Sequence, residues 1–257
     1  MVVVDMKTTI VSKVIRTRVL KKFREGVKEF ALIRPGDAIL VGLSGGKDSL
    51  ALIDLLGDML RHSNNSFTVE ALHVRMHGVD YVTDAAYLKA HCERNNIRLH
   101  LRNVSFEADT DTKRSPCFLC SWNRRKVLFE TAQMLGCNKI ALGHHQDDIL
   151  HTALMNLFYE GKFCTMPCYL EMSKMPLTII RPMCKLREVD LKDFALINEY
   201  QPLIKKCPYE NLSKRTIVAE MYNQMESSNP EFRPNLWHAL KCDGKLVQFR
   251  NATSSDI

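Results

Sequence analysis

The segment from 44 to 49 holds the residues with the clearest capacity for chemistry: Ser44, Gly45, Gly46, Lys47, Asp48 and Ser49. Two glycines let the backbone approach an anion closely, and free N–H groups at the start of a following helix would point at that anion. The pattern is not a Walker A loop, because Val41 stands where its first glycine would be and Asp48 follows the lysine. We expect a phosphate site of another type, in which Lys47 contacts phosphates and the serine hydroxyls donate hydrogen bonds.

A second polar motif, Gly143-His144-His145-Gln146-Asp147-Asp148, follows another apolar run. Two adjacent carboxylates at the carboxyl end of a strand suit Mg²⁺ shared with phosphates. The structural alternative is that Asp147 or Asp148 only caps the helix that follows.

Cysteines form a third group. Cys117 and Cys120 are spaced C-x-x-C at the start of a helical pattern, where a helix N-terminus lowers thiol pKa values. These two cysteines could bind zinc, bind an iron–sulfur cluster or form a redox pair, although the sequence context does not fit a thioredoxin-like redox pair.

The seven other cysteines are candidates for further ligands: Cys92, Cys137, Cys164, Cys168, Cys184, Cys207 and Cys242. Cys137 and Cys184 adjoin apolar runs and Cys92 lies in a helical pattern, so all three are expected in the core. A role in handling sulfur is left open for Cys164 and Cys168.

Strands and helices must alternate to position these motifs. We expect strands at 37–43, 67–74, 97–104, 139–142 and 178–183, and helices at 48–61, 83–95, 117–136, 145–159 and 186–199. Residues 161–176 are expected to be irregular. This order predicts an α/β protein with a doubly wound, Rossmann-like parallel sheet, whose site lies beyond the carboxyl ends of the strands.

The expected domain organisation has three parts. Residues 1–35 form a basic amphipathic helix, residues 36–200 the α/β domain with the C-x-x-C pair, and residues 201–257 a mostly helical C-terminal segment.

Composition limits the class of protein. The chain has 257 residues, 46% of them hydrophobic and 25% charged, as in soluble globular proteins. Nine cysteines without a signal peptide indicate a reducing compartment, and no apolar run could span a membrane. We therefore expect a cytoplasmic protein. The net charge of +7 favours a polyanionic partner.

The loop SGGKDS resembles the signature of the PP-loop ATP pyrophosphatases. Residues 40 to about 240 resemble the TtcA-type tRNA 2-thiocytidine synthetases of that superfamily, on the segments SGGKDS, CFLCSWNRRKVLF, KIALGHHQDDI, LMNLFYEGK and IIRPM. This resemblance implies ATP cleavage between the α and β phosphates, with AMP left on an acceptor oxygen.

The resemblance also implies the site residues. The loop residues 44–49, together with His73, Gly143 and Asp148, are assigned to ATP, and Asp48, Asp147 and Arg124 to catalysis. Which of the two adjacent aspartates binds Mg²⁺ is left open.

A 4Fe–4S cluster is implied on Cys117, Cys120 and Cys207, the last placed by its position shortly before the segment Arg215–Met221. The family often has another cysteine just before this one, and residues 203–206 contain none. Zinc remains the alternative metal.

The expected reaction replaces a ring oxygen of a tRNA base by sulfur. Adenylation turns the oxygen into a leaving group, and cluster-bound sulfur attacks C2 of the base, which the resemblance implies is cytidine 32. Arg124, one turn after Cys120, would stabilise the phosphate charge. Expected partners are tRNA, ATP and a cysteine desulfurase or other sulfur donor, with a homodimer left open.

Four other functions remain to be distinguished. A lysidine-synthetase-like enzyme would leave the three cysteines unexplained, and a uridine 2-thiolase of a sister family typically carries additional C-x-x-C pairs. Sulfur insertion into a small metabolite and a non-catalytic nucleotide-binding module are the remaining two.

Overall fold

The computed structural model describes residues 6–64, 66–76, 80–81, 85–105, 116–201, 205–206 and 214–250. Its helices are α1 (Met6–Glu29), α2 (Lys47–His62), α3 (Ala85–Arg94), α4 (Pro116–Met134), α5 (Gln146–Glu160), α6 (Glu188–Ile197), α7 (Lys214–Ser228) and α8 (Phe232–Cys242). Its strands are β1 (Ala38–Gly42), β2 (Thr68–Met76), β3 (Asp80–Tyr81), β4 (Arg98–Val104), β5 (Lys139–Ala141), β6 (Tyr169–Glu171), β7 (Thr178–Ile180), β8 (Lys205–Lys206) and β9 (Val247–Gln248).

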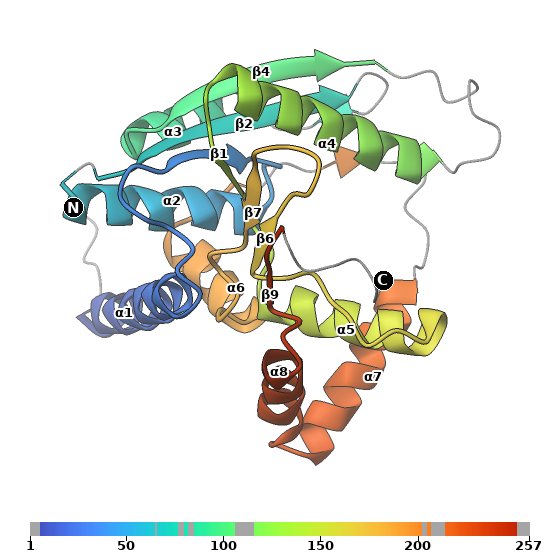
Figure 1. The fold of residues 1–257 in the computed structure, drawn as a ribbon. Helices are drawn as coiled ribbons and strands as arrows, with labels where there is room; N and C mark the ends of the chain where they lie inside the picture. Colours follow the sequence, from blue (N-terminus) through green and yellow to red (C-terminus); the bar gives the residue numbers. More distant parts are fainter. Residues whose placement is uncertain are drawn as a thin grey trace.

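Seven strands form one sheet in the order β4-β2-β1-β5-β7-β6-β9, and β3 pairs with β8 separately (Figure 1). The first five strands of this order are parallel to one another, and among the described pairings of the seven-stranded sheet only β6–β7 is antiparallel. From β1 the chain winds outward through β2 and β4, and β5 then returns to the other side of β1. This reversal confirms the doubly wound prediction, and ligands bind at such switch points.

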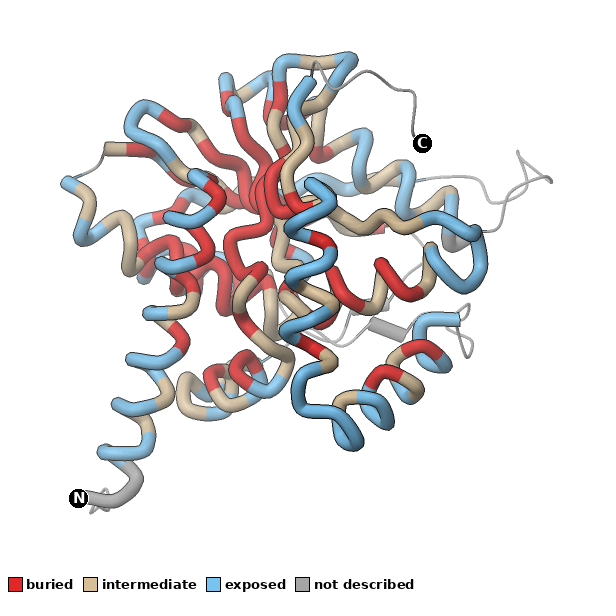
Figure 2. Tube along the Cα trace, turned by 60° about the horizontal axis from the view of Figure 1, so that its bottom comes forward, coloured by how far each residue is buried: buried red, intermediate tan, exposed pale blue. Residues whose placement is uncertain are grey.

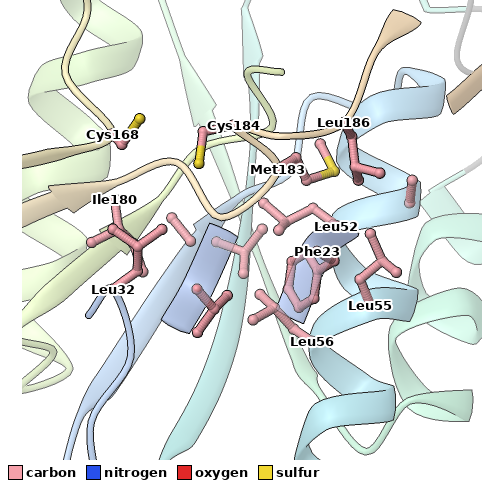
Figure 3. Close-up of a cluster of buried hydrophobic side chains, with 14 of the residues drawn as sticks. Phe23, Leu32, Leu52, Leu55, Leu56, Cys168, Ile180, Met183, Cys184 and Leu186 are labelled. Carbon is pink, nitrogen blue, oxygen red and sulfur yellow. The ribbon is translucent and has the colours of Figure 1, made fainter. Parts of the chain in front are cut away.

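The alternating side chains of β1 divide the core between the two faces of the sheet. Ile39 and Val41 join the larger cluster, beneath α1, α2, α5 and α6, whereas Leu40 joins a smaller cluster with Leu128 and Ala132 of α4. Figure 3 shows Phe23 of α1 among leucines of α2, and Figure 2 shows the buried residues concentrated in the central strands. The parallel strand is therefore apolar on both faces, as its sequence predicts.

Each expected strand and helix is present, with ends that differ by up to a few residues. The expectation that 161–176 is irregular is wrong at β6, where Tyr169 and Leu170 pair with Ile180 and Ile179 of β7. Strand β9 after α8 was not expected either, and it pairs with β6. Both strands are too short to show a periodic sequence pattern. They form because they pair with strands that are distant in the sequence.

The N-terminal and C-terminal helices share the main core. Val19 and Phe23 of α1, Val218 and Tyr222 of α7, and Leu240 of α8 all belong to the larger cluster. Among the described helices, none is both long and apolar enough to cross a membrane.

Candidate functional site

The segment Ser44–Ser49, here called the glycine loop, joins β1 to α2. Gly45 has a φ of 85°, in the left-handed region that favours glycine. Its N–H donates to Ser49 Oγ at 3.1 Å, and the Gly46 N–H donates to Ser44 Oγ at 3.3 Å. No described side chain caps the start of α2. The loop therefore presents the N-terminus of a 16-residue helix, which favours a bound anion.

Lys47 lies between two carboxylates. Its Nζ is 2.9 Å from Asp48 Oδ1 and 3.1 Å from Glu188 Oε2. Burial opposes the charged ammonium, but these two partners outweigh burial and raise the lysine pKa. Burial also raises the pKa of Asp48, against the effect of Lys47. Glu188 comes from the start of α6 and was not predicted as a site residue.

The second polar motif lies directly against the glycine loop. A Cβ on Gly143 would be 3.3 Å from the backbone N of Ser49, closer than most real contacts. On the neighbouring strand β2, His73 is buried and its Nδ1 is 2.8 Å from the carbonyl oxygen of Leu43. The carboxyl ends of β1, β2 and β5 thus bring together Gly143, His73 and the loop, as predicted.

His145 is the centre of an acidic cluster. Its Nε2 is 3.0 Å from Glu188, and Asp147 and Asp148 are also within 3.5 Å of the ring nitrogens. Burial alone would lower the pKa of His145, but hydrogen bonds to Asp147 and Glu188 raise it to about 10. The reciprocal bond from His145 lowers the pKa of Glu188 to about 2. The surrounding carboxylates therefore favour the imidazolium form of His145 at neutral pH.

The neighbouring histidine has the opposite character. Burial, reinforced by the charge of Arg181, lowers the pKa of His144 to about 4. At neutral pH this ring is uncharged, so only one of the two adjacent histidines carries charge at the site.

Arginines from the C-terminal helices hold the two adjacent aspartates. Arg233 of α8 donates to Asp147 Oδ1 at 2.6 Å and also pairs with Glu226 of α7. Arg215 of α7 donates to Asp148 Oδ1 at 2.9 Å, while the other oxygen of Asp148 accepts the His145 N–H and caps α5. Sequence reasoning missed both arginines, which are separated from these aspartates by 86 and 67 positions.

A cavity of about 130 Å³ opens beside the glycine loop. It lies between the ends of β1 and β2 and one side of α4, and is lined by Gly42, Leu43, Ser44, Leu72, Val74, Arg124, Arg125 and Leu128. Its largely apolar wall suits a planar base, and its Ser44 end adjoins the phosphate site. Arg124, predicted from the helix spacing, lines this cavity.

A family model described as the PP-loop domain matches residues 15–204. The chain belongs to the PP-loop family. Its curated relatives include the tRNA-cytidine(32) 2-sulfurtransferase of Yersinia enterocolitica, which is 32% identical over 251 residues, or 93% of this chain and 80% of the relative. The enzyme of the same name from Yersinia pseudotuberculosis is 32% identical over 256 residues, or 95% of this chain and 81% of the relative.

A solved structure among the structural neighbours of this chain has a similar fold. The U34-tRNA thiolase NcsA from Methanococcus maripaludis, solved with its [4Fe-4S] cluster, matches with a TM-score of 0.72 and 23% identity. The match covers 90% of this chain and 79% of the other. It confirms the architecture expected for the PP-loop family.

Among the residues that the structure describes, one group at the PP-loop site could hold a metal ion. Ligand atoms of Asp48, His145 and Glu188 lie within 4.8 Å of one another. Mg²⁺ prefers oxygen ligands, so the carboxylates of Asp48 and Glu188 suit it better than the imidazole of His145 does. Asp147 and Asp148, for which sequence reasoning expected this role, accept hydrogen bonds from Arg233 and Arg215. Their part in holding Mg²⁺ stays a prediction.

Cysteines of this PP-loop protein fall into two groups. Cys92, Cys137, Cys168 and Cys184 are buried, which confirms the core assignment of three of them. Burial raises the pKa of Cys92 to about 12 and that of Cys137 to about 11, and burial with the neighbouring Cys184 also raises that of Cys168. The thiols of Cys92, Cys137 and Cys168 therefore favour the protonated form and are poor metal ligands.

Cys120 differs from the buried thiols. It is only half-buried and lies one turn before Arg124 on α4, so a soft sulfur ligand lies one helical turn from a residue that lines the cavity. The side chain of Cys117 and the whole of Cys207 lie outside the described residues. The three-cysteine cluster therefore stays a prediction, with which the position of Cys120 is compatible.

Proposed function

We propose that this chain is an ATP-dependent tRNA sulfurtransferase that forms 2-thiocytidine at position 32. The observation that carries the proposal is the 32% identity, across 95% of the chain, with tRNA-cytidine(32) 2-sulfurtransferases. The residues at the switch point of the sheet are those that such chemistry requires. The three-part division at residues 35 and 200, a cytoplasmic location and a homodimer belong to the proposal as well.

The nucleotide binds across the switch point. Its phosphates lie against the glycine loop, where Lys47 and the hydroxyls of Ser44 and Ser49 provide donors, and its base enters the adjoining cavity. Asp48 and Glu188 would hold Mg²⁺, which would supply positive charge to neutralise the phosphates. Gly143, Asp148 and His73 keep the surrounding backbone and helix start in position.

Adenylation is the first chemical step. The O2 atom of the cytosine attacks the α-phosphorus of ATP, the bond to the β-phosphate oxygen breaks, and pyrophosphate leaves. Arg124 stabilises the negative charge that develops on the α-phosphate. Asp147 acts through its bonds to His145 and Arg233, and keeps that cationic pair beside the reacting phosphates.

Sulfur transfer completes the reaction. An iron–sulfur cluster bound by Cys117, Cys120 and Cys207 would supply the sulfur that replaces the adenylated oxygen at C2. Departure of AMP restores the aromatic base. A cysteine desulfurase or another sulfur donor would renew the sulfur.

The test is mass spectrometry of tRNA nucleosides from cells with and without the gene. Loss of 2-thiocytidine on deletion, restored by the intact gene but not by Cys120→Ser, is expected. Unchanged 2-thiocytidine in the deletion strain would contradict the proposal. Restoration by Cys164→Ser serves as the matched control, since Cys164 is also half-buried but bonds Asn156 away from α4.

A further inference from the structure

One side of α4 carries large aromatic groups that face solvent. Phe118 is 42% exposed and Trp122 is 45% exposed. Arg125 and Lys126 follow Trp122 by three and four residues, and Trp122 follows Phe118 by four. Residues three or four apart lie on the same face of a helix, so all four form one stripe. We call these four residues the outer stripe.

The outer stripe is continuous with the nucleotide cavity. Arg125 belongs to the stripe and also lines the cavity together with Ser44 and Arg124. Figure 1 shows the start of α4 on the side of the sheet to which β2 and β4 point, where the glycine loop also lies. A molecule seated on the stripe would therefore reach the cavity without crossing the core.

The indole ring of Trp122 is positioned to stack on a planar group. The ammonium of Lys126 lies 5.6 Å from the centre of its indole ring, within range of a cation–π contact. The exposed remainder of the ring offers a flat apolar surface. Lys126 also lies 3.9 Å from Glu130, an exposed carboxylate one turn further along the helix.

The surrounding charge favours RNA over a protein partner. Arg124, Arg125 and Lys126 are consecutive cations beside the exposed rings. Aromatic side chains interleaved with cations are the means by which proteins bind unpaired nucleotides, since bases stack on rings and phosphates pair with cations. Protein–protein interfaces are also enriched in aromatic residues and arginine but are depleted of lysine, so Lys126 and the run of three cations are what favour RNA here.

We propose that the outer stripe holds unpaired nucleotides of the tRNA loop, with a base stacked on Trp122 and phosphates on Arg125 and Lys126. The inference rests on the proposed function and names the residues that present the substrate to the cavity. Trp122 is in this sense a positioning residue and takes no part in the chemistry.

Intrinsic fluorescence tests the stacking directly. The chain has two tryptophans, so Trp237→Phe leaves Trp122 as the single tryptophan, and excitation beyond the tyrosine absorption band selects its emission from that of the seven tyrosines. The full-length protein, purified without oxygen, is titrated with an anticodon stem–loop RNA. The same stem closed into a blunt duplex without unpaired bases is the comparison. Quenching by the stem–loop and not by the duplex is expected.

Binding measurements on three variants quantify the effect. Trp122→Ala should raise the Kd for the stem–loop about 5- to 150-fold, the range expected from loss of one stacked base. Trp122→Phe keeps a ring and should stay within about threefold of the parent. Leu196→Ala removes a side chain that is 78% exposed on α6 and should leave the Kd unchanged.

Activity and assembly separate the outcomes. If thiolation proceeds but Trp122→Ala leaves the Kd and the KM for tRNA unchanged, the inference is wrong while the proposed function stands. If the stem–loop quenches Trp122 but no 2-thiocytidine forms, the stripe binds RNA and the proposed function fails. A change from dimer to monomer in Trp122→Ala, without any change in RNA affinity, would assign the stripe to a protein interface and overturn the inference.

Discussion

Lys47 is the residue at which the glycine loop meets the acidic cluster. Its ammonium contacts Asp48 of its own helix and Glu188 of α6. Carboxylates from two helices hold this ammonium at the start of α2. The ammonium is therefore positioned to bind phosphates before any substrate arrives. Positioning of this kind costs no reorganisation during the reaction.

Replacement of Lys47 tests this role. Lys47→Met should reduce tRNA-dependent AMP formation by about 100-fold or more, because a phosphate-binding cation is lost from the transition state. Lys192→Met is the matched control, since Lys192 also pairs with Glu188, at 3.4 Å, but is 65% exposed. Equal losses in the two variants would show that only the charge around Glu188 matters.

His145 makes stability depend on pH in a defined window. Its pKa is about 10 in the folded protein and about 6.5 when unfolded, so protonation stabilises the fold fully below pH 6.5 and ceases to do so as the pH rises through 10. The free-energy difference between the parent and His145→Asn should therefore shrink from pH 6.5 to pH 10 in urea unfolding. A constant difference would contradict the assignment.

His144 provides the internal comparison. Its folded pKa is lowered to about 4, so protonation affects stability only as the pH falls below about 6.5. The difference in free energy of unfolding between the parent and His144→Asn should accordingly stay the same between pH 6.5 and pH 10.

At the scale of elements, α7 and α8 complete the site from the far end of the chain. Arg233 and Asp147 form an ion pair whose side chains are 10% and 12% exposed, whereas Arg215 is 46% exposed. Removal of one partner from a buried pair leaves an uncompensated charge, and removal of an exposed partner does not.

Two alanine variants should separate these cases. Arg233→Ala is expected to lower the free energy of unfolding by about 3–5 kcal/mol, and Arg215→Ala by about 0–1 kcal/mol. Denaturant unfolding of both proteins measures the difference. Similar values for the two arginines would mean that the Arg233 pair is effectively solvated.

The elements also show what sequence patterns can and cannot predict. Strand β1 and the helix starts at Lys47 and Gln146 were predictable, because an apolar run followed by glycine or paired aspartates is a local signal. Glu188 and Arg233 carry no such signal, since only the packing of α6 and α8 brings Glu188 to His145 and Arg233 to Asp147. Strand β6 depends in the same way on its pairing with β7. The convergence of Cys117 and Cys207 with Cys120 stays a prediction.

At the scale of the whole molecule, the terminal helices are integral to the core. Phe23 of α1 and Tyr222 of α7 are 1% and 0% exposed within the same cluster as the strands. Helices that bury such side chains in a shared core have little stability of their own.

We therefore expect one cooperative unfolding transition. Calorimetry of the metal-free and nucleotide-free protein should give equal calorimetric and van't Hoff enthalpies. A separate transition for residues 214–250 would instead support an independently folded C-terminal unit.

The close packing at Gly143 limits which parts of the enzyme can change when its substrate changes. A Cβ at position 143 would lie only 3.3 Å from the backbone nitrogen of Ser49. The turn after β5 and the start of α2 are therefore packed so closely that neither can move without the other. A backbone shift made to admit a different base on one side is transmitted to the phosphates on the other. Changes of substrate in this scaffold are therefore expected to arise in its side chains and surface helices, while the two turns stay fixed.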